Sequence, residues 1–242
     1  MASPEILTNA GLWIAGYDLQ SNLNTIAISA EAQAEDVTTF GDTNRTYAVG
    51  VKRALYSGAG LLDAPAEAEL QTDWGLSNLA LTISKATTIN SVAFVGKVLL
   101  GQFQQSRSVN APWTFSLNGE MCDRGFGRGR VMENQAAVTA TGTGTGRQLR
   151  AISSGFKAFA TLHVLSVSGT TPSLTVILES DDNSGFTSPT TRATFTAATL
   201  VGGQHTSVDG PITDDYWRFK WTVSGTSPSF AFVCALGFEQ PV

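Results

Sequence analysis

Few side chains in this sequence are of the types that carry out catalysis, and they are scattered. Among 242 residues the chain has only two histidines, His163 and His205, and two cysteines, Cys122 and Cys234. It contains no Gly-x-Ser-x-Gly turn, no cysteine close to a histidine and no histidine–glutamate pair at metal-ligand spacing. We therefore expect no catalytic centre, no metal site and no cofactor, and we interpret the chain as something other than an enzyme.

Each of these four residues has a structural interpretation. His163 lies in an alternating apolar segment, which favours a structural role, whereas His205 lies in a glycine-rich stretch that predicts a solvated loop. The cysteines occur in apolar or mixed surroundings without a Cys-x-x-Cys motif, which is typical of small buried side chains. A disulfide between them is the alternative.

Two acidic pairs offer oxygen atoms as possible ligands. Asp181 and Asp182 stand in the segment ESDDNSGF, and clustered carboxylates of this kind can bind calcium. The segment lacks the loop with a closing glutamate that such calcium sites have, so a turn between strands is favoured. The same interpretation applies to Asp214 and Asp215.

An aromatic run and an arginine run could each contact a ligand. Trp217, Phe219 and Trp221 alternate and so share one face of a strand, which favours packing in a core or interface over a sugar-stacking platform. Residues 124–130 read RGFGRGR and could be an RNA-binding segment. Because the chain is acidic, with a net charge of -5, a glycine-kinked strand is favoured instead.

The composition favours strands and turns. Charged residues make up only 14% of the chain, and its 24 glycines are accompanied by many threonines and serines. No apolar run approaches the ~20 residues that cross a bilayer. The first residues also lack the basic start followed by an apolar stretch that is typical of a signal peptide. We expect a soluble protein made in a reducing cytoplasm, without a membrane segment.

The first half of the chain predicts strands with one helix between them. Residues 24–36, NTIAISAEAQAED, alternate with a period of two. Residues 64–76, APAEAELQTDWGL, place Pro65 at a helix start and Glu67 and Glu69 in the first turns, where the helix dipole favours acids. This is the one helix that the sequence predicts.

A low-complexity stretch suggests a domain boundary. Residues 138–150 read VTATGTGTGRQLR, an alternation of threonine and glycine that is typical of a flexible crossing. We expect a first domain over residues 1–138, a linker over 139–149 and a second domain over 150–242. The stretch is not a phosphate-binding loop, because no Lys-Ser or Lys-Thr pair follows it and no helix signal begins there.

The second half consists of strand patterns separated by turn signals, which predicts an antiparallel β-sandwich of jelly-roll or immunoglobulin-like type. One phrase occurs twice in it. Residues 167–176 read VSGTTPSLTV and residues 223–232 read VSGTSPSFAF. Since glycine and proline favour connections over strand interiors, both copies are predicted to be hairpins, in which a strand turns and returns along itself.

The first half also resembles a known family. The segment GYDLQSNLNTIAISAEAQAEDVTTFGDTNR resembles the opening of the major tail tube proteins of tailed bacteriophages, with matches at residues 16–19 and 36–43. GAGLLDA at residues 58–64 fits the same pattern, so the resemblance covers roughly residues 10–135. The remainder resembles β-sandwich segments fused to phage virion structural proteins, and no functional residue is carried over to it.

The resemblance implies a fold and a function. The fold would be a mainly β chain: a tail-tube-like β-sandwich or barrel with one short helix, followed by the second sandwich. The function would be a structural virion protein that forms rings of copies of itself, hexameric in this family, which stack into the tail tube with other virion proteins. DNA would pass through the tube without specific binding.

Two groups of residues are predicted to serve this assembly. Within the polar loop over residues 38–50, a short run is expected to contact the next ring: Asp42, Thr43, Asn44, Arg45 and Thr46. A second group is expected to line the lumen and repel DNA, because lysine and arginine there would bind phosphates without regard to sequence. It comprises the acids Glu31, Glu35 and Asp36, with Asp42 as a further candidate; the alternative is that these are solvated strand ends.

Two other functions remain open from the sequence. A capsid decoration or cement protein would bind only to preformed heads. A carbohydrate-binding module would stack sugars on alternating aromatic residues such as Trp217 and Trp221.

Overall fold

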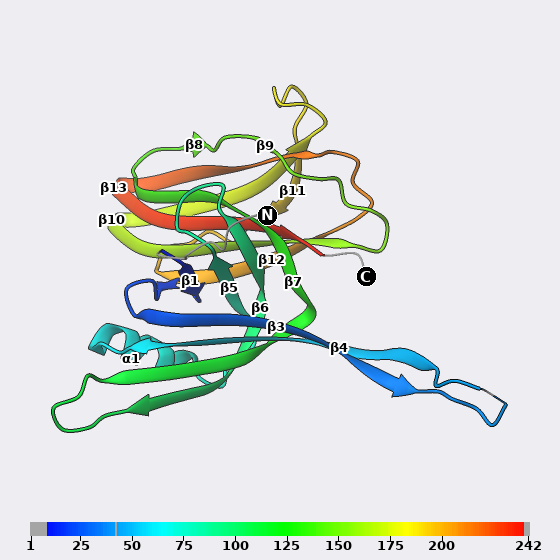
Figure 1. Cartoon of the computed structure of the whole chain (residues 1–242). Helices are drawn as coiled ribbons and strands as arrows, with labels where there is room; N and C mark the ends of the chain where they lie inside the picture. Colours follow the sequence, from blue (N-terminus) through cyan, green and yellow to red (C-terminus); the bar gives the residue numbers. More distant parts are fainter. Residues whose placement is uncertain (1–8, 42, 240–242) are drawn as a thin grey trace, which may run out of the picture.

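Antiparallel strands make up most of the chain (Figure 1). The structure, a computed structural model, describes residues 9–41 and 43–239. The strands up to residue 138 are β1 (Gly11–Ile14), β2 (Tyr17–Asp18), β3 (Leu23–Asp36), β4 (Tyr47–Leu61), β5 (Leu79–Ser84), β6 (Val92–Ser106) and β7 (Thr114–Val138). Those that follow are β8 (Gly142–Thr143), β9 (Arg147–Gln148), β10 (Lys157–Asp181), β11 (Thr190–Thr194), β12 (Gly202–Asp209) and β13 (Tyr216–Phe238). The prediction of a mainly β fold is confirmed.

The predicted helix is present as α1 (Ala64–Asp73). Asp63 caps its start, where the carboxylate accepts a hydrogen bond from the backbone N–H of Ala66 at 2.9 Å. Ala66 and Leu70 are fully buried and attach the helix to the sheet. Its last turn contains no basic residue, and the chain leaves the helix at Trp74.

One long strand connects the two halves of the sheet. The sheet order is β11-β10-β13-β7-β6-β5-β1-β2, with β4 added to β7 and β3 added to β4. The first seven residues of β7 pair with β4, while its last part, from residue 128, pairs with β13. A buried cluster at this junction draws on both sides of residue 138 and includes Trp13, Val131, Phe159 and Val233. The division of the chain into two domains there stays a prediction.

The threonine- and glycine-rich stretch lies along β13. Its two short strands, β8 and β9, pair with residues 220–221 and 216–217 respectively. A methyl group at Gly144 would come within 1.8 Å of Oε1 of Glu133, so the absence of a side chain permits this close packing.

The repeated phrase forms two sharp bends. Backbone φ angles are positive at Gly169 (111°) and Thr171 (47°) in β10, and at Gly225 (119°) and Ser227 (48°) in β13. The predicted hairpins are nevertheless wrong, because the arms of each strand do not pair with each other. Instead β10 pairs with β13 on both sides of the bend, and the two copies of the phrase lie opposite one another.

The bend folds this strand pair over onto itself. Within β13 alone, the rings of Trp221 and Phe232 lie 5.5 Å apart, and those of Trp217 and Phe238 lie 5.8 Å apart. Residues so distant in one strand can meet only if its two arms face each other across a core. The two layers seen around β10 and β13 in Figure 1 are therefore the two arms of one folded ribbon.

Candidate assembly surface

The hairpin formed by β3 and β4 extends away from the body of the molecule (Figure 1). Among the described residues, β3 pairs with β4 alone, and β4 in turn pairs with β7 through residues 55–61. Every side chain of β3 from Ser29 to Asp36 is exposed. We call residues 29–53 the arm; it has few packing contacts, and its strands are held together mainly by each other.

The end of the arm is a turn with a defined base. The N–H of Val37 donates to the carbonyl oxygen of Thr46 at 2.9 Å, and the N–H of Thr46 donates to the hydroxyl of Thr38 at 3.0 Å. The carboxylate of Asp36 accepts hydrogen bonds from the hydroxyl and the N–H of Thr38, and these bonds lower the pKa of Asp36. Beyond this base, the side chain of Phe40 is fully exposed.

The predicted contact loop lies in this tip. Thr43, Asn44, Arg45 and Thr46 are all exposed there, while Asp42 lies outside the described residues. The structure therefore brings the described members of the loop together at the far end of the arm. Their contact with another copy stays a prediction.

The β3–β4 hairpin continues at its base into a four-stranded part of the sheet that has two free edges. Its strand order is β3, β4, β7 and the distal part of β6. Within the described ranges, no strand pairs with the outer edge of β3, and none pairs with the outer edge of β6 over residues 102–106. Unpaired backbone groups along an edge can bind the edge of another sheet.

The outward face of this sheet is hollowed. The hollow measures about 830 Å³ and is lined mostly by small or neutral polar side chains, among them Ala27, Ser29, Ser57, Gln102 and Asn118.

The charged residues of the hollow are two acids and one base, Glu31, Glu120 and Arg53, so the base offsets one of the two acids. Arg53 forms an ion pair with Glu120, and Glu31 stands directly opposite Arg53 in the strand register. Glu120 first, and Glu31 more weakly, raise the pKa of Arg53.

The predicted lumen acids lie in three different surroundings. Glu31 is on the hollowed face, Glu35 is farther along the arm opposite Ala48, and Asp36 is engaged in the tip turn. The sequence interpretation missed Glu120, which alternates with Ser116 and Asn118 on β7 and so shares their face. Only the pairing of β7 with β4 shows that this face is the one bearing Glu31.

The residues considered for catalysis have structural roles. His163 is buried, its Nε2 lies 3.0 Å from the hydroxyl of Thr82, and burial lowers its pKa to about 3. His205 was predicted in a solvated loop, but it lies in β12 opposite Thr161 and packs on Phe159.

Both cysteines are free thiols. Cys234 is buried and Cys122 half-buried, so the disulfide alternative is wrong.

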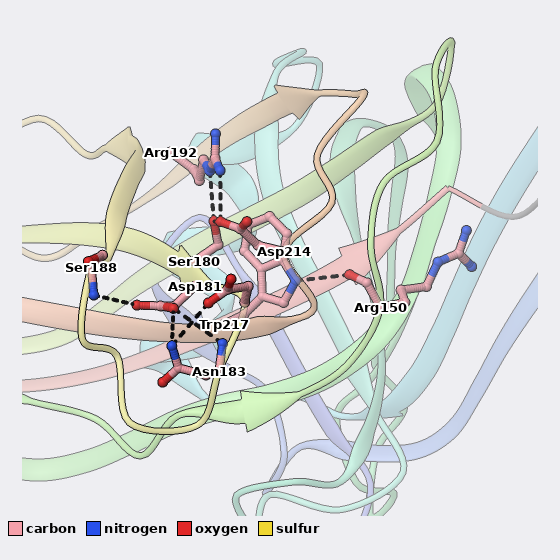
Figure 2. A network of polar contacts seen from close by, with 9 residues as sticks. Arg150, Ser180, Asp181, Asn183, Ser188, Arg192, Asp214 and Trp217 are labelled. Carbon is pink, nitrogen blue, oxygen red and sulfur yellow. Dashed lines mark hydrogen bonds and ion pairs between the residues drawn. The ribbon is translucent and has the colours of Figure 1, made fainter.

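The acidic pairs stabilise loops (Figure 2). The carboxylate of Asp181 accepts hydrogen bonds from the N–H of Asn183 at 3.2 Å and of Ser188 at 2.9 Å, which closes the turn between β10 and β11. Asp214 accepts from the hydroxyl of Ser180 at 2.7 Å and from Arg192 at 2.8 Å, and these contacts lower its pKa. Within the described part of the chain, no group of acids, histidines or cysteines could hold a metal ion.

The aromatic run lies in the core. Trp217 and Phe219 are fully buried and Trp221 nearly so, which confirms core packing and excludes these rings as a sugar-binding platform. The indole N–H of Trp217 donates to the carbonyl oxygen of Arg150 at 2.9 Å (Figure 2).

The arginine-rich run, residues 124–130, lies within β7, in agreement with the prediction that it forms a strand. A methyl group at Gly129 would come within 1.9 Å of the carbonyl oxygen of Leu236, so glycine allows β7 to approach β13. The side chain of Arg130 donates to the carbonyl oxygen of Asn90 at 2.8 Å.

No helix in the described residues is long and apolar enough to cross a membrane.

Comparisons with known proteins find only distant similarity. No protein-family model and no curated protein matches the chain. Among solved structures, a chain from the virion of a native gene transfer agent particle matches with a TM-score of 0.38 and 23% identity, over 48% of this chain and 94% of that one. A chain from the tail of an empty gene transfer agent particle, of C6 symmetry, matches with a TM-score of 0.35 and 18% identity, over 42% and 78%.

A third match extends along almost the whole chain. The Dit protein of SPP1, described as a paradigm of the hub adsorption apparatus of phages that infect Gram-positive bacteria, matches with a TM-score of 0.35 and 8% identity, over 95% of this chain and 98% of that one. At these identities and TM-scores, the similarities identify neither a family nor a function for this protein.

Proposed function

We propose that this protein is a structural component of a phage tail, in which copies join edge to edge into rings that stack into a tube. The observation that carries the proposal is the four-stranded sheet with two free edges and a projecting arm. The resemblance of residues 10–135 to major tail tube proteins supports it. By that resemblance the ring is hexameric, other virion proteins are its partners, and the virion is its location.

The two free edges suit a ring. They belong to different strands, β3 and β6, so a contact between them joins unlike surfaces of two copies. A contact between unlike surfaces repeats from copy to copy and closes into a ring when the rotation per copy permits. Pairing would also satisfy backbone groups that a monomer leaves to water.

The hollowed face suits the wall of a conduit for DNA. Lysine and arginine side chains bind phosphates without sequence preference, so a wall rich in them would retain DNA. On this face the basic residue Arg53 is neutralised by Glu120 and faces Glu31. A lining of serine, alanine, asparagine and glutamine, whose charged residues are two glutamates and one arginine, would let DNA slide.

The arm suits contact between rings. It projects well beyond the four-stranded sheet, and its tip ends in exposed residues that include Phe40 and Arg45. An isolated monomer gains nothing from a long hairpin whose described side chains are exposed, whereas a neighbouring ring can bury it.

Electron microscopy of the purified protein at high concentration tests the proposal. We expect rings and stacked tubes from the full chain, and rings without tubes from a variant that lacks residues 42–46. A Leu200→Ser variant is the matched control, because Leu200 is as exposed as the tip but lies in the loop between β11 and β12; it should form tubes.

Two results would contradict the proposal. Tubes from the deletion variant would remove the arm's role between rings. Monomers alone from the full chain, combined with binding to preformed capsids, would identify a capsid-decorating protein instead.

A further inference from the structure

The chain segment that follows α1 presents two apolar side chains to solvent on a rigid turn. Trp74 and Leu76 are both about half-exposed. The backbone between them is held in place: the N–H of Gly75 donates to the carbonyl oxygen of Leu100 at 3.0 Å, and the N–H of Leu100 donates to that of Leu76 at 3.2 Å. We call residues 74–76 the helix turn.

An exposed tryptophan on a fixed backbone is typical of the centre of a protein–protein contact. Tryptophan is among the residues most enriched at energetic hot spots, and a backbone that is already ordered loses little entropy on binding. The indole of Trp74 is exposed to solvent, whereas the indoles of Trp217 and Trp221 are buried in the core.

The surroundings of the helix turn are acidic. Asp73 directly precedes it, and Glu69 lies one turn earlier in α1. From residue 54 to residue 84 the sequence contains no lysine or arginine. The carbonyl end of a helix adds partial negative charge at the same place.

Asp73 itself lacks a partner for one oxygen. Its Oδ2 is buried and, among the described residues, accepts no hydrogen bond. Burial, and then the charge of Glu69, raise the pKa of Asp73 to about 6. A cationic group placed nearby would favour the ionised carboxylate.

The tip of the arm has complementary features. Phe40 is a fully exposed apolar side chain, and Arg45 is an exposed cation in the same loop. In Figure 1 the tip lies at one end of the molecule and α1 lies toward the opposite end. Opposite ends that fit each other generate an open series of copies rather than a closed pair.

We propose that the helix turn is the receptor for the arm of a second copy in the adjacent ring, with Phe40 packed against Trp74 and Leu76 and with Arg45 beside the acidic end of α1. This inference rests on the proposed tail-tube function, and it names the surface that the arm binds.

Cross-linking between two variants, in each of which the introduced cysteine is accessible while Cys234 stays buried, tests the contact. In a Cys122→Ala background, Phe40→Cys protein is mixed with Trp74→Cys protein under mild oxidation and at tube-forming concentration. Assembly raises the effective concentration of contacting groups. The yield of mixed disulfide dimer should therefore exceed the yield in a control mixture by at least about tenfold. In the control mixture Leu200→Cys replaces Trp74→Cys, because Leu200 is exposed and lies in the loop between β11 and β12.

A second variant gives a readout that does not depend on cysteine chemistry. Trp74→Glu should remain folded, because the side chain is exposed, and should form rings that do not stack. Circular dichroism and thermal unfolding check the fold, and electron microscopy counts rings and tubes.

The outcomes separate this inference from the function it rests on. Tubes from the unmodified protein, without a preferred Phe40→Cys to Trp74→Cys cross-link or with tubes still formed by Trp74→Glu, would overturn the receptor and leave the tube. An unmodified protein that forms neither rings nor tubes would overturn both. A preferred cross-link together with unstacked rings from Trp74→Glu is the result we expect.

Discussion

Two long antiparallel strand pairs in this protein have opposite environments. The pair β10–β13 buries one face along both arms, with Val164, Leu178 and Phe232 almost fully inaccessible. The pair β3–β4 leaves all of its distal side chains that the structure describes exposed, from Ser29 to Arg53. The comparison shows that strand pairing alone creates no core, since burial depends on what covers the faces of the pair.

The physical reason lies in side chains and in the bend. β10 and β13 place valine, leucine, phenylalanine and tryptophan on one face, and the bend at residues 167–176 and 223–232 brings that face onto itself. The distal part of β3 alternates alanine with glutamate and glutamine, and its side chains are exposed. The folded ribbon is complete within one chain, whereas we propose that the arm is buried by another copy.

Removing a large side chain from the folded ribbon should have the largest effect. Trp217→Ala deletes a fully buried indole that contacts Phe238 and donates to Arg150. We expect a loss of about 3–5 kcal/mol in the free energy of unfolding, measured by chemical denaturation. Trp74→Ala, which truncates an exposed indole, is the matched control, and its free energy of unfolding should fall by less than about 1 kcal/mol. Equal losses in the two variants would contradict the claim that the folded ribbon carries a core that exposed side chains lack.

A methyl group at the bend should have an intermediate effect. Gly225 has a φ of +119°, and an added Cβ would lie 2.7 Å from the carbonyl oxygen of Thr171 in the other copy of the phrase. Gly225→Ala should lower the free energy of unfolding by about 2–3 kcal/mol.

The control for this variant is Gly155→Ala. Gly155 also has a positive φ, of +82°, but no atom stands within 4 Å of the added Cβ. The free energy of unfolding of Gly155→Ala should fall by only about 1 kcal/mol, because alanine tolerates a positive φ less well than glycine. If the two variants lose the same amount, the close approach of the two bends contributes nothing to stability.

Removing the buried charge near the arm's proposed receptor should stabilise the monomer. The pKa of Asp73 is raised to about 6 in the folded chain from an ordinary value of 3.8, so the folded state binds its proton more tightly than the unfolded state does. Stability from this group is present at pH below about 4 and is lost as the pH rises through 6. Asp73→Asn should therefore gain stability relative to the unmodified protein as the pH rises from 4 to 7.

The gain should reach about 1 kcal/mol at pH 7, a value reduced because the group is partly solvated. Thermal unfolding at a series of pH values measures it. An Asp73→Asn variant that is less stable than the unmodified protein at pH 7 would show that the carboxylate is stabilised by a contact, contrary to its unpartnered oxygen.

Changes at the arm tip should have the smallest effect on the monomer. Phe40→Ser alters a fully exposed side chain, so the free energy of unfolding should change by less than about 0.5 kcal/mol. The same change should raise the concentration needed for tubes to form, measured by light scattering. A marked loss of monomer stability would show that the arm tip is packed within its own chain.

Several features of the fold and of the candidate surface could be predicted from the sequence. The alternation in residues 24–36 predicted β3, and the proline and acids after residue 63 predicted α1. The alternating Trp217, Phe219 and Trp221 indicated a buried face. These predictions succeed because they depend on local periodicity and helix-end chemistry, which each segment carries in itself.

Other predictions failed because they concerned partners distant in the sequence. His205 was assigned to a loop because its neighbours include two glycines, but β10 supplies the strand that pairs with it. Glu120 was overlooked because its neighbour across the hollow, Arg53, stands 67 residues earlier in the chain.

The repeated phrase shows most clearly what each level decides. The sequence by itself determined that the chain is mainly β, that it bends at both copies of VSGT, and that α1 begins after Asp63, since glycine, proline and capping residues act over a few bonds. Only the tertiary structure decided that the two bends lie opposite each other and that, among the described residues, no strand pairs with the outer edge of β3 or with that of β6 over residues 102–106. A strand's backbone satisfies its hydrogen bonds equally well with any partner, so the choice of partner depends on which faces the whole chain can bury together.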